Sequence, residues 1–119
     1  MPKRVSASRA ALPRKRRNDL DEMFASVSPE AAAFVNGKVA LRAKLTRAIE
    51  RLGEVFPSRP AHLRRYEDPE SGEWDLFVEV QRGPDLDEDY EKLRAVETRW
   101  IHDREDPKRE LTFSFYFGR

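Results

Sequence analysis

The chain has 119 residues and a net charge of +1, with 39% hydrophobic and 38% charged residues, so it can build one modest core beneath a heavily charged surface. It has no cysteine, which excludes disulfides, thiolate metal sites and cysteine nucleophiles and is compatible with a reducing cytoplasm, where we expect the protein. No run approaches the roughly 18 apolar residues of a membrane span, so no membrane partner is expected.

The positive charge is concentrated at the start of the chain. Residues 1–17 hold seven basic and no acidic side chains, while the other 102 residues hold 16 basic and 22 acidic ones. Residues 1–18 lack apolar periodicity, which predicts a disordered basic arm before a single α+β domain over residues 19–119. The basic arm and a basic stripe in the first helix can contact phosphates. The candidate nucleic-acid-binding residues are Arg14, Lys15, Arg16, Arg17, Lys44, Arg47 and Arg51.

The first helix is predicted to begin at Ser28-Pro29, because serine is a good N-cap and proline suits the first helical position. The apolar stripe that follows carries the helix to about Val55. Asn36-Gly37 interrupts this span with two poor helix formers, and the sequence leaves open whether the helix breaks there.

A β-hairpin is predicted next. Residues 61–67 read as a strand polar enough for a sheet edge, and Asp68-Pro69 suits the start of a type I turn that Gly72 completes in the left-handed conformation. In the following strand, residues 74–81, every second residue from Trp74 to Val80 shares one face, and the residues between them share the other.

The last two elements are a second helix and a terminal strand. Asp85 and Glu88 have the spacing of a capping box for a helix that ends near His102. Residues 111–117 then alternate apolar side chains with Thr112, Ser114 and Tyr116. The predicted order is α-β-β-α-β: an α+β fold whose three-stranded sheet carries its helices on one face.

The terminal strand is the strongest interaction signal, because it is uncharged and rich in β-forming residues. At a sheet edge such a strand is an aggregation hazard unless a partner or a second copy covers it. The sequence leaves an edge position and a central one equally open. The candidate interface residues are Thr112, Phe113, Ser114, Phe115 and Tyr116.

The sequence contains no clear catalytic or cofactor motif. It has no glycine-rich phosphate loop, no nucleophile elbow and no zinc-ligand spacing, so we expect no cofactor, no bound metal and no small-molecule substrate. Asp68, Glu79 and Gln81 fit loosely the acid-and-D/E-x-K pattern of Mg²⁺-dependent PD-(D/E)xK nucleases, with Gln81 in place of lysine. The question of enzymatic activity stays open, with the balance toward a non-enzyme.

The segment Tyr66-Glu67-Asp68-Pro69-Glu70-Ser71-Gly72, with Leu76 to Val80 and the helix that ends near Trp100, resembles small uncharacterised bacterial proteins with a Y-x-DPE-x-G hairpin. The resemblance covers about residues 56–117. Such proteins are often encoded near toxin–antitoxin or defence genes, which implies an antitoxin-like or accessory role.

These observations together favour a non-enzymatic protein that binds a macromolecule, with a protein partner or a homodimer as the first expectation. Nucleic-acid binding through the basic arm is the alternative, and a Mg²⁺-dependent nuclease is the least favoured one.

Overall fold

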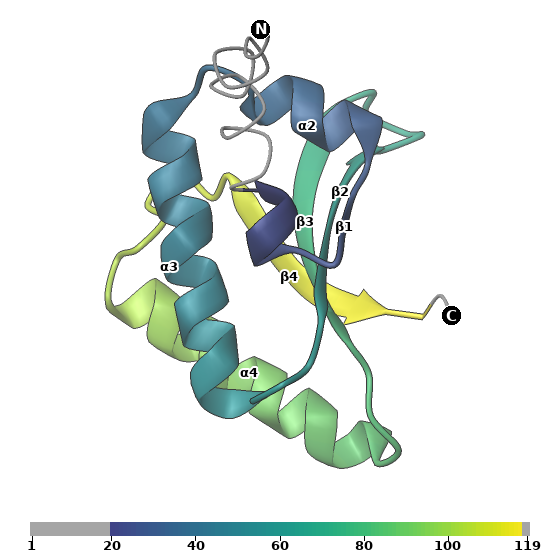
Figure 1. Ribbon diagram of the computed structural model, residues 1–119, viewed down its shortest axis with the longest axis vertical. Helices are drawn as coiled ribbons and strands as arrows, with labels where there is room; N and C mark the ends of the chain where they lie inside the picture. Colours follow the sequence, from purple (N-terminus) through teal and green to yellow (C-terminus); the bar gives the residue numbers. More distant parts are fainter. Residues whose placement is uncertain (1–19, 118–119) are drawn as a thin grey trace, which may run out of the picture.

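The computed structural model describes residues 20–117, and the predicted arm over residues 1–18 lies outside them. After a helical turn at residues 20–23, the elements are β1 (Ser26–Val27), α2 (Pro29–Val35), α3 (Val39–Val55), β2 (Ala61–Glu67), β3 (Trp74–Gln81), α4 (Leu86–His102) and β4 (Leu111–Tyr116). The α+β class and the predicted helix–strand order from the first helix onward are confirmed (Figure 1).

The sheet has four strands in the order β1-β2-β3-β4, so the prediction of three strands is wrong. β1 runs parallel to β2, held where Ala61 O accepts a hydrogen bond from Ala25 N (2.7 Å) and Leu63 O accepts one from Ser28 N (2.9 Å). This pairing also places β2 inside the sheet, contrary to the predicted edge position. Two residues are too few to show the alternation by which a strand is recognised in a sequence.

The first helix breaks at Asn36-Gly37. α2 ends at Val35 and α3 begins at Val39, and Gly37 between them has a φ of 80°, a left-handed conformation that glycine adopts at little cost. The break lets α2 turn across one end of the sheet while α3 runs along it (Figure 1).

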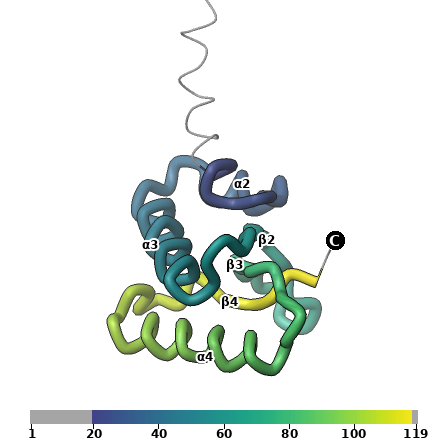
Figure 2. The backbone as a smooth tube through the Cα atoms, turned by 60° about the horizontal axis from the view of Figure 1, so that its bottom comes forward, coloured from purple at the N-terminus to yellow at the C-terminus, as the bar shows by residue number. Residues whose placement is uncertain are grey.

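The hydrophobic core lies on one face of the sheet, between the strands and the helices. Alternate residues of the strands, such as Leu63, Val78 and Phe113, are buried beside Leu45 of α3 and Val96 of α4 in a single core. Figure 2 shows α2, α3 and α4 above, beside and below the strands, and no helix of residues 20–117 lies on the remaining side. None of the helices within residues 20–117 is long and apolar enough to cross a membrane.

Side-chain caps hold the β2–β3 hairpin turn and the start of α4, at the residues that the sequence indicates. In the β2–β3 hairpin, Asp68 Oδ1 accepts a hydrogen bond from Glu70 N at 2.9 Å, and Gly72 has a φ of 77°. At the start of α4, Asp85 Oδ1 accepts one from Glu88 N at 3.1 Å. α4 then returns the chain over the sheet, so that β4 lies parallel to β3.

Candidate functional site

β4 is an edge strand. It pairs with β3 from Leu76↔Leu111 to Gln81↔Tyr116 and has no strand on its other side in the described part of the chain. Within residues 20–117 no other backbone segment hydrogen-bonds to residues 112–116 apart from β3. The strand therefore presents free backbone donors and acceptors along an uncharged edge, which is the geometry that accepts an added strand.

The five candidate interface residues divide between the two faces of the sheet. Phe113 and Phe115 are buried in the core, where Phe113 packs edge-to-face on Trp100 with ring centroids 5.3 Å apart. The other face of the sheet, opposite the hydrophobic core, is called the helix-free face below. Thr112 is exposed on this face, and Ser114 and Tyr116 are half-buried there. An added strand would thus contact aromatic side chains on one face and hydroxyl groups on the other.

The helix-free face carries a connected polar and aromatic cluster. Tyr116 reaches across β3 to stack on His62, with ring centroids 3.7 Å apart, and Arg64 lies over the same tyrosine ring at 5.4 Å. His62 Nδ1 is 2.6 Å from Ser26 Oγ, and its Nε2 is 3.3 Å from Gln81 Oε1. These contacts join β1, β2, β3 and β4 through side chains.

Glu79 lies within this cluster and is only 7% exposed. Burial raises the pKa of its carboxyl above the ordinary value, while a hydrogen bond with Tyr66 and the charge of Arg64 oppose that shift. Burial also lowers the pKa of His62, helped by the charge of Arg64 and opposed by a hydrogen bond with Gln81. Both shifts disfavour the charged forms, so the cluster favours a neutral histidine and an acid that resists ionisation.

The residues of the nuclease pattern are not brought together. Asp68 is exposed at the hairpin turn, and its carboxylate is used by Glu70 N. Asp68 lies opposite Glu73, six residues along the chain from Glu79, so at about 3.3 Å per residue the two acids lie roughly 20 Å apart. Gln81 is beside Glu79 on the same face but contacts His62. Among residues 20–117, no group of three or more acids, histidines or cysteines is arranged to hold a metal ion.

The basic stripe of α3 is paired with the acidic loop after α4. Lys44 contacts Asp106 at 2.8 Å, Arg47 contacts Glu105 at 2.9 Å, and Arg51 also contacts Glu105, at 2.8 Å. All three cations therefore help to hold this loop against α3, which leaves them less available to phosphates. The other candidate phosphate-binding residues, Arg14, Lys15, Arg16 and Arg17, lie outside the described residues.

No family model, no curated protein and no solved structure matches this chain. The resemblance to bacterial hairpin proteins therefore stays an expectation.

The cluster on the helix-free face was not predicted as a site. Its signal in the sequence is the alternation of His62, Arg64 and Tyr66 on β2, which places three hydrogen-bonding side chains on one face. That pattern is also typical of an ordinary solvated strand. Only the tertiary structure stacks Tyr116 on His62 and buries Glu79.

Proposed function

We propose that this chain is a protein-binding module that takes up an extended segment of a partner protein by strand addition at β4. The observation that carries the proposal is the position of β4: an uncharged strand at the edge of the sheet, with one backbone side unpaired in the described residues. Natural proteins usually protect such edges with charges, prolines or bulges. The segment Leu111–Tyr116 has no charge and no proline.

The side chains beside this edge support the same role. Thr112 and Ser114 can offer hydroxyl groups to an added strand on the helix-free face, and Tyr116 ends the strand with a half-buried ring. Main-chain hydrogen bonds give affinity in this mode of recognition, and alternate side chains give specificity. An antitoxin-like or accessory role, which only the resemblance implies, is one setting for such a module.

Nuclease activity has less support from the geometry, because Asp68 is exposed in the hairpin turn whereas Glu79 is buried near the other end of β3. Nucleic-acid binding through Lys44, Arg47 and Arg51 is disfavoured because acidic partners occupy these side chains.

Amide hydrogen exchange tests the proposal residue by residue. The chain is used as bait in a nuclease-treated extract of its source cells, and the captured partner is then added to the purified protein. We expect every second amide of residues 112–116 to exchange quickly in the free chain and to become protected in the complex. The amides of β3, which are already paired on both sides, serve as the internal control.

Two results would overturn the proposal. One is a partner whose binding leaves the exchange of the β4 amides unchanged, because the binding surface then lies elsewhere. The other is the loss of all partners after nuclease treatment, which would assign the chain to nucleic acid.

A further inference from the structure

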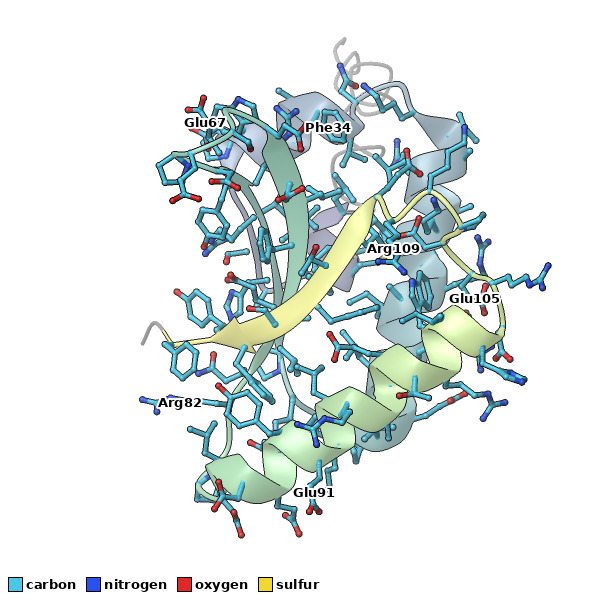
Figure 3. The ribbon with its side chains drawn as sticks, turned by 180° about the vertical axis from the view of Figure 1, so that it is seen from behind. Phe34, Glu67, Arg82, Glu91, Glu105 and Arg109 are labelled. Carbon is cyan, nitrogen blue, oxygen red and sulfur yellow. The ribbon has the colours of Figure 1, made fainter. Side chains whose placement is uncertain are left out.

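A groove of about 550 Å³ lies between α4 and the outer side of β4. Side chains from α4, from the loop over residues 103–110 and from the first half of β4 line it. In Figure 3, Arg109 lies in the space between β4 and α4. The groove therefore adjoins the strand edge on which the proposed function depends, so a segment added to β4 would place alternate side chains in it.

The floor and one wall of this groove are apolar. Trp100, Leu111 and Phe113 are buried at its base, and Ile101 of α4 is 64% exposed beside them. The indole Nε1 of Trp100 is buried without a hydrogen-bond partner in the described chain. An exposed isoleucine beside buried aromatic rings is an incomplete core face, which an apolar side chain of a partner can complete.

Three arginines surround this apolar base: Arg94 from α4, and Arg104 and Arg109 from the loop. All three are exposed, and within residues 20–117 none of their guanidinium groups forms a hydrogen bond or ion pair. They differ in this respect from Arg47 and Arg51 of α3, which are paired with the same loop.

Two acids line the groove beside the three arginines, and the carboxylate of one of them is already occupied. Asp106 is buried, and its carboxylate is occupied by Lys44 and by the backbone N–H groups of Glu110 and Leu111. Glu97 is half-buried in the lining, and burial raises the pKa of its carboxyl, with the charge of Arg94 opposing the shift.

The loop holds two of the arginines in an unusual backbone conformation. Arg104 has a φ of 54° and Arg109 a φ of 55°, in the left-handed region that non-glycine residues rarely adopt. Hydrogen bonds from Arg104 N to Ile101 O (3.0 Å) and from Arg109 N to Asp106 O (3.0 Å) fix both turns. Such conformations cluster at binding sites, where the surrounding structure maintains them.

We infer that the groove binds an acidic segment of a protein partner, in which carboxylates pair with Arg94, Arg104 and Arg109 while apolar side chains contact Trp100 and Ile101. This inference rests on the proposed function, because strand addition at β4 is what brings the segment to the groove. Arginine suits this task because its planar fork can hold a carboxylate through two parallel hydrogen bonds.

The groove fits an acidic peptide better than a nucleic acid. Single-stranded nucleic acids are bound by stacking of bases on exposed aromatic faces, whereas Trp100 is only 4% exposed and Phe113 only 6%. The neighbouring strand edge offers peptide donors and acceptors with strand spacing, which a peptide backbone matches and a sugar-phosphate backbone does not.

The test uses fluorescein-labelled synthetic peptides of about nine residues, the length of a long strand. The first alternates glutamate with valine around a central phenylalanine, and the second carries lysine at every glutamate position. A single-stranded DNA of similar length is the third probe. Binding to the full chain is followed by fluorescence anisotropy at about 50 mM and about 300 mM salt, and exchange of the β4 amides is recorded with each peptide.

The variants are chosen to remove charge without disturbing the loop. Arg104→Asn and Arg109→Asn keep a residue that tolerates the left-handed conformation, and Arg94→Gln keeps a good helix former. Lys108→Asn is the matched control, because Lys108 is an exposed cation of the same loop that does not line the groove. We expect the triple arginine variant to lose about tenfold or more in affinity for the glutamate peptide and Lys108→Asn to lose little.

The outcomes separate this inference from the proposed function. Preference for the glutamate peptide, weakened by salt and by the triple variant, supports the inference. Equal binding of both peptides with protection of β4 overturns the acidic preference and leaves strand addition standing. Binding of neither peptide, or binding of DNA alone, overturns both.

Discussion

The rings of His62 and Tyr116 stack face to face across β3, with centroids 3.7 Å apart and planes inclined by 21°. The two residues belong to β2 and β4, which are not neighbours in the sheet. The tyrosine therefore spans the intervening strand β3, on which Glu79 is also buried. Its ring lies directly on the buried imidazole of His62.

Removal of this cover should shift the titration of His62. Burial lowers the pKa of His62 below 6.5, so its share of folding stability is present above pH 6.5 and is lost as the pH falls through the lower folded value. We expect Tyr116→Ala to raise the pKa of His62 in the folded chain and so to reduce the loss of folding stability at low pH. NMR titration of the His62 ring measures this pKa.

Tyr116→Phe is the control for this experiment, because it keeps the stacked ring and removes only the hydroxyl. An unchanged His62 titration in Tyr116→Ala would contradict the account, since another group would then be responsible for the burial.

Glu79 gives a pH effect of the opposite sign. Burial raises the pKa of its carboxyl above 4.5, so its contribution to folding stability is full below pH 4.5 and is lost as the pH rises through the folded value. Glu79→Gln cannot ionise and still offers Tyr66 an acceptor. We expect this variant to unfold at a higher temperature than the wild type at pH 7 and at about the same temperature at pH 4.

Asp75→Asn provides the comparison for Glu79→Gln, because Asp75 is exposed on the same face of β3. A Glu79→Gln variant that is less stable than the wild type at pH 7 would contradict this prediction, because the ionised carboxylate would then stabilise the folded state.

Local signals predicted much of this fold. The hairpin turn at Asp68, the cap at Asp85 and the alternation of β3 all act within a few residues, so the sequence displays them directly. β1 was missed because its existence depends on the distant partners His62 and Leu63 rather than on its own two residues. The number of strands was therefore the part of the fold that local reasoning could not supply.

The candidate site was predictable only in part. The uncharged strand Leu111–Tyr116 indicated an interface, but its place at the edge depends on the crossover through α4. The sequence could not show that Arg94, Arg104 and Arg109 line one groove, because they come together only when the loop folds back beside α4. By contrast, the sequence showed Lys44 as part of a basic stripe, but it could not show that Lys44 pairs with the distant Asp106.

The buried ion pair between Lys44 and Asp106 should dominate the stability of the loop that carries these arginines. Asp106 accepts hydrogen bonds from Lys44 Nζ at 2.8 Å, from Glu110 N at 2.9 Å and from Leu111 N at 2.8 Å. Asp106→Ala leaves a buried lysine and two backbone amides with fewer partners, so we expect a loss of about 3 kcal/mol in the free energy of unfolding. Urea denaturation measures this loss.

Glu110→Ala is the matched variant, because Glu110 contacts the same lysine from a side chain that is 41% exposed. We expect it to cost less than about 1 kcal/mol. Equal losses for the two variants would contradict the claim that burial of Asp106 sets the difference.

Two glycines at opposite ends of α3 should respond oppositely to alanine. Gly53 is exposed within the helix, and a Cβ there would meet no atom within 4 Å, so Gly53→Ala should raise the free energy of unfolding by roughly 0.5–1 kcal/mol. Gly37 also has open space, but its φ of 80° is unfavourable for alanine, so Gly37→Ala should lower the free energy by about 1 kcal/mol. Chemical denaturation of both variants gives the comparison.

A Gly37→Ala variant that is more stable than the wild type would contradict the second prediction. It would mean that α2 and α3 can join into one helix without loss of stability, so that the break is not needed to place α2 across the sheet.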